Sequence, residues 1–184
     1  DRAIVKDVAM TYEKHTPQRV RDSVGNFFNN LASLNTIAND YLQGHFAQGW
    51  RNTERTAINT TVGVLGLFDP ADDLGRPRTP NDFGITLARW GVGSGPYLVL
   101  PLLGASSARD LPAFVVARVT NPMFWLNPPW EVSLSMDAIS MIDNRARLQP
   151  QVEFRDRAAL DPYTFTRDIY LRSRALRAGE PIPD

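Results

Sequence analysis

Apolar residues recur at helical spacing along most of the chain. Between residues 129 and 148 two apolar stripes run side by side, one through Val132, Met136 and Ile139 and the other through Leu134, which predicts a helix contacted on more than one side. The same period predicts helices over residues 3–15, 18–34, 46–67 and 161–178. No segment alternates convincingly with the period of two that marks a half-buried strand. The pattern therefore predicts an all-α fold of short and medium helices.

Prolines punctuate these helices. Six of the 14 prolines follow a residue that favours a helix N-cap, namely Thr16, Asp69, Thr79, Asn121, Asn127 and Asp161. Because proline is favoured at the first helical position, each pair predicts a helix start. Ser107 and Asp110 have the spacing of a capping box before a further helix. The apolar run 97–103 contains Pro101, which argues against a central strand there.

Length and composition narrow the class of protein. A chain of 184 residues is expected to form a single domain, here spanning 1–184. Lys and Arg together number 20, as do Asp and Glu, and this balance argues against a nucleic-acid-binding domain. The most apolar stretch, residues 112–130, is interrupted by Arg118, Asn121 and Asn127, so it does not predict a transmembrane helix. The absence of cysteine excludes disulfides and thiolate chemistry.

Candidate catalytic groups are sparse. His15 and His45 belong to no metal-ligand spacing, and no nucleophile elbow or Walker A loop occurs. The glycine run 91–95 precedes Pro96 rather than a helix start, so a dinucleotide site is not indicated. Asp69, with Asp72 and Asp73, is read either as a cation site or as a helix cap with acidic residues in the first turn, and the cap is favoured. We therefore expect no enzyme, no cofactor and no metal.

Arginines gather near the C-terminus. Residues 145–179 contain eight arginines and four acids. This segment is either a solvated helix face with pairs such as Asp168–Arg172 or a docking surface for an acidic partner or lipid phosphates. The candidate contacts for a partner or headgroup are Arg145, Arg167, Arg172 and Arg174.

A glycine run leads into an apolar arm. Gly91, Gly93 and Gly95 allow large backbone excursions, which predicts a hinge. The arm that follows carries no charge until Arg109, so its side chains should face a core, a bilayer or an apolar path.

The string FG-x-T-L-x-x-x-G-V-G-x-G-P-Y-x-x-L-P-x-x-G, from Phe83 to Gly104 and followed by Arg109-Asp110, closely resembles the MlaA/VacJ family of bacterial outer-membrane lipoproteins. Other segments agree with this resemblance, and together they cover nearly the whole chain: Tyr41–Gly44, Arg55–Asp69, Arg145-Ala146, and Asp161–Tyr163 with Arg167 and Tyr170. The family's lipid-bearing cysteine and the segment just after it are absent from this sequence.

The resemblance implies an all-helical, ring-shaped protein, lipid-anchored and lying in the inner leaflet of the outer membrane of Gram-negative bacteria. It implies a central amphipathic channel that removes mislocalised phospholipids from the outer leaflet and passes them to a periplasmic carrier. The implied partners are phospholipid, that carrier and a trimeric porin, and no bond chemistry is involved.

Within that expectation, the Gly91–Gly95 hinge and the arm form a channel-wall hairpin. The channel wall or lipid path is assigned to Tyr97, Leu98, Val99, Leu100, Pro101, Leu102 and Leu103. Met136 is expected on the opposite wall or exit. Trp90, Trp125, Trp130 and Tyr97 lie either in the core or at headgroup level, where amphipathic rings are favoured. The competing hypothesis is a soluble helical interaction module that docks through its arginine-rich C-terminal segment. A lipid-modifying enzyme ranks last, because no nucleophile–base pair is visible.

Overall fold

The computed structural model describes residues 2–101 and 103–182, with side chains described from residue 6. This part of the chain is mostly helical, as predicted, but the hairpin contains two short antiparallel strands that the sequence pattern did not predict. The helices are α1 (Arg2–His15), α2 (Gln18–Leu42), α3 (Phe46–Thr61), α4 (Pro70–Asp73), α5 (Phe83–Arg89), α6 (Leu111–Thr120), α7 (Pro122–Leu126), α8 (Trp130–Arg147), α9 (Gln149–Ala158) and α10 (Pro162–Ala178). The strands are β1 (Tyr97–Leu100) and β2 (Gly104–Ser107).

Three of the predicted helix caps are confirmed. The side chains of Asp69, Asn121 and Asp161 accept hydrogen bonds from backbone N–H groups in the first turns of α4, α7 and α10. These bonds satisfy amides that a helix leaves without intrahelical partners. Asp69 therefore caps α4, the interpretation that the sequence favours.

The other predicted caps are wrong, although the predicted ranges 18–34 and 129–148 begin within one residue of α2 and α8. α2 and α8 begin directly after Pro17 and Pro129, so neither Thr16 nor Asn127 is an N-cap. α5 is capped by Asp82 rather than by Thr79. The Ser107–Asp110 capping box does not form either, because the Asp110 carboxylate accepts hydrogen bonds from Arg174 and Tyr170 instead of capping α6.

Two helices differ in length from the predicted ranges. α2 continues to Leu42 instead of ending near residue 34, because the polar residues of its last turns lie buried against α3 and α5 rather than in a loop. α3 ends at Thr61, and the chain then turns tightly. In this turn Val64 and Leu65 both adopt positive φ, and Gly66 packs where a Cβ would collide with Asn30.

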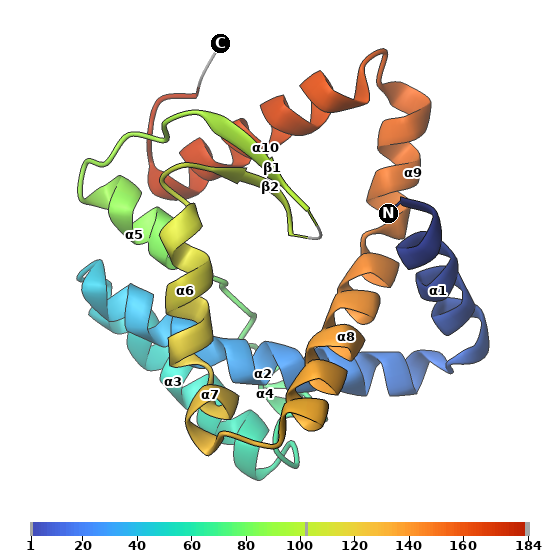
Figure 1. The fold of residues 1–184 in the computed structure, drawn as a ribbon. Coiled ribbons are helices and arrows are strands. Elements are labelled where there is room, and N and C mark those ends of the chain that lie inside the picture. The colour runs from blue at the N-terminus through green and yellow to red at the C-terminus, as the bar shows by residue number, and fades with distance from the viewer. Residues whose placement is uncertain (1, 102, 183–184) are drawn as a thin grey trace.

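Figure 1 shows how the elements are arranged. α2 packs along α3 and also contacts α5, α6 and α8, while α1 packs on α8. α8 leads through α9 into α10, which contacts α5 and β2. The helices follow one another around the outside of the view, and the β1–β2 hairpin lies inward of α10 (Figure 1).

The buried apolar residues are few and mostly small. Ile85, Ala88 and Ala178 form one cluster where α5 meets α10, and the other buried apolar residues among those described are Ala9, Ala71, Ala146 and Ala175. Buried polar and charged side chains are more numerous than these. The fold therefore depends on hydrogen bonds and ion pairs to hold its elements together, more than a water-soluble domain of this size normally does.

Candidate functional site

Large apolar side chains lie on the outside of the molecule. All four tryptophans are more than half exposed: Trp50 at 64%, Trp90 at 55%, Trp125 at 74% and Trp130 at 71%. Burying a large apolar side chain stabilises a protein in water by about 1.5–3 kcal/mol, so a water-soluble fold buries most of them. This exterior instead suits apolar surroundings. None of the described helices is both long enough and apolar enough to cross a bilayer.

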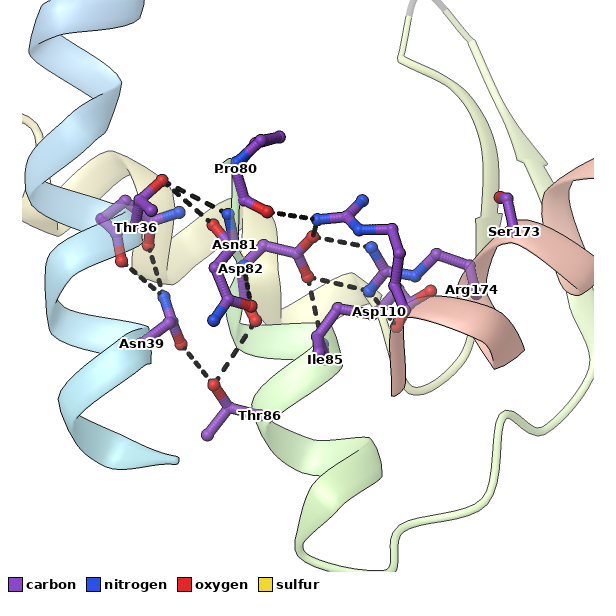
Figure 2. Close-up of polar contacts among 12 residues, drawn as sticks. Thr36, Asn39, Pro80, Asn81, Asp82, Ile85, Thr86, Asp110, Ser173 and Arg174 are labelled. Atoms are coloured by element: carbon purple, nitrogen blue, oxygen red, sulfur yellow. Dashed lines mark hydrogen bonds and ion pairs between the residues drawn. The ribbon is translucent and has the colours of Figure 1, made fainter. Parts of the chain in front are cut away.

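Polar groups occupy the interior between α2, α3 and α5. Asp40 accepts hydrogen bonds from the amide nitrogens of Asn52 at 2.6 Å and Asn81 at 2.8 Å. The Thr86 hydroxyl donates to Asn39 at 2.7 Å, and both residues are fully buried (Figure 2). Because buried polar groups are costly unless they are hydrogen-bonded, these contacts fix how the three helices pack.

A charged network joins α5, α6 and α10. Arg174 donates to both carboxylate oxygens of Asp82, at 2.6 and 2.8 Å, and to Asp110 at 2.9 Å (Figure 2). The Tyr170 hydroxyl donates to the other oxygen of Asp110. Gly84 makes this approach possible, because a Cβ there would collide with Asp110 and Arg174. The network therefore fixes the base of the hairpin, which leads into α6, against α10.

The pKa values in this network follow from its pairing. Burial by itself raises the pKa of Asp82, but the hydrogen bonds and charge of Arg174 outweigh burial and hold that pKa below its ordinary value. Burial, together with the hydrogen bond to Asp110, raises the pKa of Tyr170 to about 12. Burial lowers the pKa of Arg174, but its two carboxylate partners raise the pKa by more than burial lowers it, so the net shift is upward. All three groups therefore keep the protonation states that the network requires at neutral pH.

The arm predicted as a channel wall is the β1–β2 hairpin. Tyr97 pairs with Ser107 and Leu100 with Gly104, so Pro101 lies in the turn between the strands, where no ladder hydrogen bond is required. Tyr97 packs against Tyr163 and Tyr170 of α10, with ring centroids 5.7 and 5.8 Å apart. The strand base is thus attached to α10, and the turn extends away from it.

A pocket of about 330 Å³ lies where α1, α2 and α8 meet. Its polar groups already contact one another, because Arg147 donates to Asp143 at 2.7 Å and to the backbone carbonyl of Arg21. Outside the pocket lining, Tyr12 of α1 donates to Asp143 at 3.2 Å. This pocket is therefore a junction that ties α8 to the N-terminal helices. Within residues 2–101 and 103–182 no three His, Asp or Glu side chains gather as metal ligands would.

Comparison with known proteins identifies the family. The model of the MlaA lipoprotein family matches residues 1–177, which is nearly the whole chain. The chain belongs to the MlaA lipoprotein family. MlaA lipoproteins are proteins of the Gram-negative outer membrane that serve lipid transport, and they are not a known enzyme family. Membership implies a role in maintaining the lipid asymmetry of that membrane.

Similar sequences and a solved structure fit this assignment. The intermembrane phospholipid transport system lipoprotein MlaA of Escherichia coli (strain K12) is 32% identical over 176 residues, covering 94% of this chain and 68% of that protein. An uncharacterized protein of Rickettsia felis is 34% identical over 182 residues, covering 98% of this chain and 72% of the relative. A solved structure described as the structural basis for maintenance of bacterial outer membrane lipid asymmetry superimposes with a TM-score of 0.82 at 30% identity, covering 97% of this chain and 89% of that chain.

The predicted hinge glycines of this MlaA chain occupy different conformations. Gly91 and Gly95 have φ of +89° and +66°, whereas Gly93 does not have positive φ and has open space where a Cβ would lie. The segment between them is tied down, because Arg109 donates through its backbone N–H to the Ser94 carbonyl and through its guanidinium to the Val92 carbonyl. The hinge stays a prediction, and any motion there must break the Arg109 contacts.

The predicted wall residues are only partly sheltered. Tyr97, Leu98 and Leu100 are half-buried, while Val99, Pro101 and Leu103 are exposed. Leu102 lies outside the described residues. Met136 is half-buried on α8, which lies away from the hairpin in Figure 1. Their role in a lipid path stays a prediction.

Among the predicted partner contacts, Arg174 does not fit its assigned role. Its guanidinium is buried between Asp82 and Asp110, so it is not available to an external partner. Arg145 of α8 donates to Gln149 at the start of α9. Arg167 pairs with Asp168, so the anticipated Asp168–Arg172 pair is not the one that forms. Arg172 is exposed.

Sequence reasoning missed most of the polar interior. Asn39, Asp40, Asn52 and Thr86 are among the most buried residues, yet each is of a type normally found at the surface. A signal was present, because the polar residues Asn35, Asn39, Thr36, Asp40 and Gln43 recur at helical spacing on one face of α2. A polar face on a helix normally indicates the side exposed to water. It predicts a polar interior only for a protein whose apolar faces lie on the outside.

Proposed function

We propose that this protein removes mislocalised phospholipids from the outer leaflet of the outer membrane and passes them to a periplasmic carrier. It does so through a central amphipathic channel while lying in the inner leaflet as a lipid-anchored protein. This activity would maintain the lipid asymmetry of the membrane. It involves no bond chemistry.

The observation that carries this proposal is the reversed distribution of side chains. Trp50, Trp125 and Trp130 face outward, while Asn39, Asp40 and Arg174 are buried. A leaflet solvates the apolar exterior but offers no partners to polar groups, so it favours a fold that satisfies those groups internally. The same distribution argues against a soluble interaction module, because such an exterior would aggregate in water.

The arrangement of the helices supports a ring around a lipid path. In Figure 1 the helices follow the periphery and the hairpin lies inward from α10. The half-buried Leu98 and Leu100 lie on one face of β1, and the exposed Val99 lies on the other, because successive side chains of a strand alternate. We place the lipid path along the face that carries Leu98 and Leu100.

The partners follow from the same proposal. The E. coli relative is named as part of an intermembrane phospholipid transport system, so a periplasmic carrier and other components of that pathway are the expected partners. A trimeric porin is a further proposed partner. Arg145, Arg167 and Arg172 are the remaining arginines proposed to contact a partner or a headgroup, because Arg174 is already paired inside the fold.

The test compares charges on the two faces of β1. Leu98→Asp and Leu100→Asp are expressed in a strain that lacks the native gene, beside Val99→Asp as the matched control. We expect at least one of the Leu variants to fold but to let phospholipid accumulate in the outer leaflet, since a carboxylate on a wet channel wall stays hydrated while it obstructs acyl chains. Thermal melting in detergent measures folding, and phospholipase accessibility on intact cells measures outer-leaflet phospholipid.

Two outcomes contradict the proposal. If both Leu variants unfold, this face of the strand is a packed core and not a lipid path. If both fold and clear phospholipid as well as the wild type, the path does not run past Leu98 and Leu100. The Val99 variant shows whether a charge anywhere on the hairpin is enough to cause the defect.

A further inference from the structure

α6 and α7 form an apolar elbow, in which α6 contacts α2 and α5. We define the α6–α7 elbow as residues 111–126; its two helices contain no buried residue. Its exposed large apolar side chains are Leu111, Phe114, Val115, Val119, Phe124, Trp125 and Leu126. It contains one charged side chain, Arg118, which pairs with Asp137 of α8 at 3.3 Å. An exposed surface of this composition calls for an apolar occupant.

The end of α6 is hydrogen-bonded by the elbow's own side chains. A helix leaves its last four carbonyls without intrahelical partners, and in water the solvent satisfies them. Here the Trp125 indole N–H donates to the Val119 carbonyl at 2.7 Å. The Thr120 hydroxyl donates to the Val116 carbonyl at 2.7 Å and lies 3.3 Å from the Ala117 carbonyl. The backbone N–H of Asn121 donates to the Arg118 carbonyl at 3.3 Å.

The start of α7 is satisfied in the same way. The Asn121 side chain accepts from the Met123 backbone N–H at 2.9 Å, and Pro122 has no N–H to satisfy. The backbone of this junction therefore needs few hydrogen bonds from its surroundings, although the side chains of the junction are exposed. Internal hydrogen bonding of this kind matters little in water, where every exposed carbonyl can bind a water molecule. It matters greatly in hydrocarbon, which offers no hydrogen-bond partner.

We propose that the α6–α7 elbow lies among the acyl chains of the leaflet, and that Trp125 keeps the end of α6 hydrogen-bonded there. A protein partner fits less well, because protein interfaces carry about one hydrogen bond per 100–200 Å² and this elbow offers almost no polar group for one. The Arg118–Asp137 pair marks its polar edge, where a long arginine side chain reaches headgroups. The inference rests on the proposed seat in a leaflet.

Single-cysteine labelling tests the location. The chain contains no cysteine, so Val115→Cys and Leu126→Cys each place one environment-sensitive NBD label on the elbow. Arg157→Cys on α9 is the control, because the Arg157 side chain is 78% exposed and lies in a polar helix. The labelled proteins are reconstituted in vesicles of phosphatidylethanolamine and phosphatidylglycerol. A nitroxide on the acyl chain should quench the elbow labels more than the control, and aqueous iodide should do the reverse.

Two results would overturn the proposal. Iodide quenching of the elbow labels as strong as that of the control places the elbow in water. Elbow labels shielded from both quenchers place it against protein, for example a second copy of this chain.

Trp125 has a matched control in Trp130, which is nearly as exposed and whose indole N–H makes no hydrogen bond within the described part of the chain. In the Val115→Cys background, Trp125→Phe removes the donor to Val119 but keeps an aromatic ring. We expect iodide quenching to rise roughly twofold or more, since a carbonyl left without its partner in hydrocarbon draws the segment toward water. Trp130→Phe should leave the quenching unchanged, and equal effects of the two variants would refute the role of Trp125.

The same variants separate this inference from the proposed function. An elbow in the acyl region with no clearance of outer-leaflet phospholipid from cells would defeat the proposed function alone. An elbow in water with clearance intact would defeat this inference alone.

Discussion

At the scale of single residues, Arg174 shows how much of the fold depends on a few polar contacts. It joins carboxylates from two distant segments, Asp82 before α5 and Asp110 before α6, and all three groups are largely withdrawn from water. An ion pair in such a position contributes little net stability by itself, but removing one partner leaves an uncompensated charge. The cost of a substitution should therefore depend strongly on which arginine of α10 is changed.

We expect Arg174→Ala to destabilise the protein by about 3–5 kcal/mol, because Asp82 and Asp110 would lose their shared cation. Arg172→Ala, at an exposed position of the same helix, should change stability by less than about 0.5 kcal/mol. Thermal melting of both variants in the same detergent makes the comparison. Equal melting temperatures for the two variants would contradict the structural role of Arg174.

Asp82 should make the fold sensitive to acid. Arg174 holds the folded-state pKa of Asp82 below the ordinary value of 3.8. A lowered pKa means that the stabilisation is fully present above about pH 4 and is lost as the pH falls through the folded-state pKa. Asp82→Asn should therefore be less stable than the wild type at neutral pH, and the difference should shrink as the pH falls below 4. Chemical unfolding at a series of pH values measures this, and a constant difference would contradict it.

At the scale of elements, the hairpin and the glycines before it form one unit whose base is fixed. Tyr97 packs on two tyrosines of α10, and Arg109 binds the backbone of the glycine segment as well as Glu180 beyond α10, at 2.8 and 3.0 Å. The predicted hinge is therefore restrained at both sides. The conformational freedom of glycine is therefore needed at Gly91 and Gly95, which have positive φ, and not at Gly93.

Gly91 and Gly93 offer a direct test of the hinge. Gly91→Ala places a side chain at φ of +89°, which costs about 1–2 kcal/mol for an L-residue, whereas Gly93→Ala meets open space at ordinary φ. We expect the first change to shift the hairpin and alter outer-membrane permeability, while the protein stays folded, and the second to be silent. Detergent sensitivity of cells and circular dichroism of the purified variants report the two effects. A folded Gly91 variant with wild-type permeability would count against a hinge at this glycine.

At the scale of the whole molecule, the exterior is unusually apolar and the interior is unusually polar. The cluster of Ile85, Ala88 and Ala178 is small for a chain of 184 residues, and all four tryptophans face outward. Burial of apolar surface therefore contributes less to the stability of this fold than to that of a typical soluble domain. The surroundings must supply the apolar contacts that the core does not.

This composition predicts dependence on detergent. Without detergent, the purified protein should self-associate, because exposed apolar patches of this extent associate in water. With detergent it should elute as a discrete particle carrying bound detergent. Size-exclusion chromatography with light scattering resolves the two states, and a monodisperse, detergent-free monomer would favour the competing soluble interaction module.

Local features of this protein could be predicted from the sequence because their causes lie within a few residues. Asp161 caps α10 through amides two and three residues away, and the start of α7 at Asn121-Pro122 is equally local. The family is also a property of the sequence, because the string from Phe83 to Gly104 carries it without reference to the fold. The strands of the hairpin escaped prediction because Pro101 argues against a strand over residues 97–103, whereas it lies in the turn between two short strands.

Only the tertiary structure decided which polar groups lie inside. Arg174 contacts Asp82, 92 residues away in the sequence, and Asp110, 64 residues away. The residues near Arg174 in the sequence therefore predict only a surface arginine. In the same way α2 continues through Asn39 and Asp40 because Thr86 and Asn52 reach them from other helices. The physical reason is that a polar residue can be buried only when a partner from elsewhere in the chain satisfies it, and local sequence does not specify that partner.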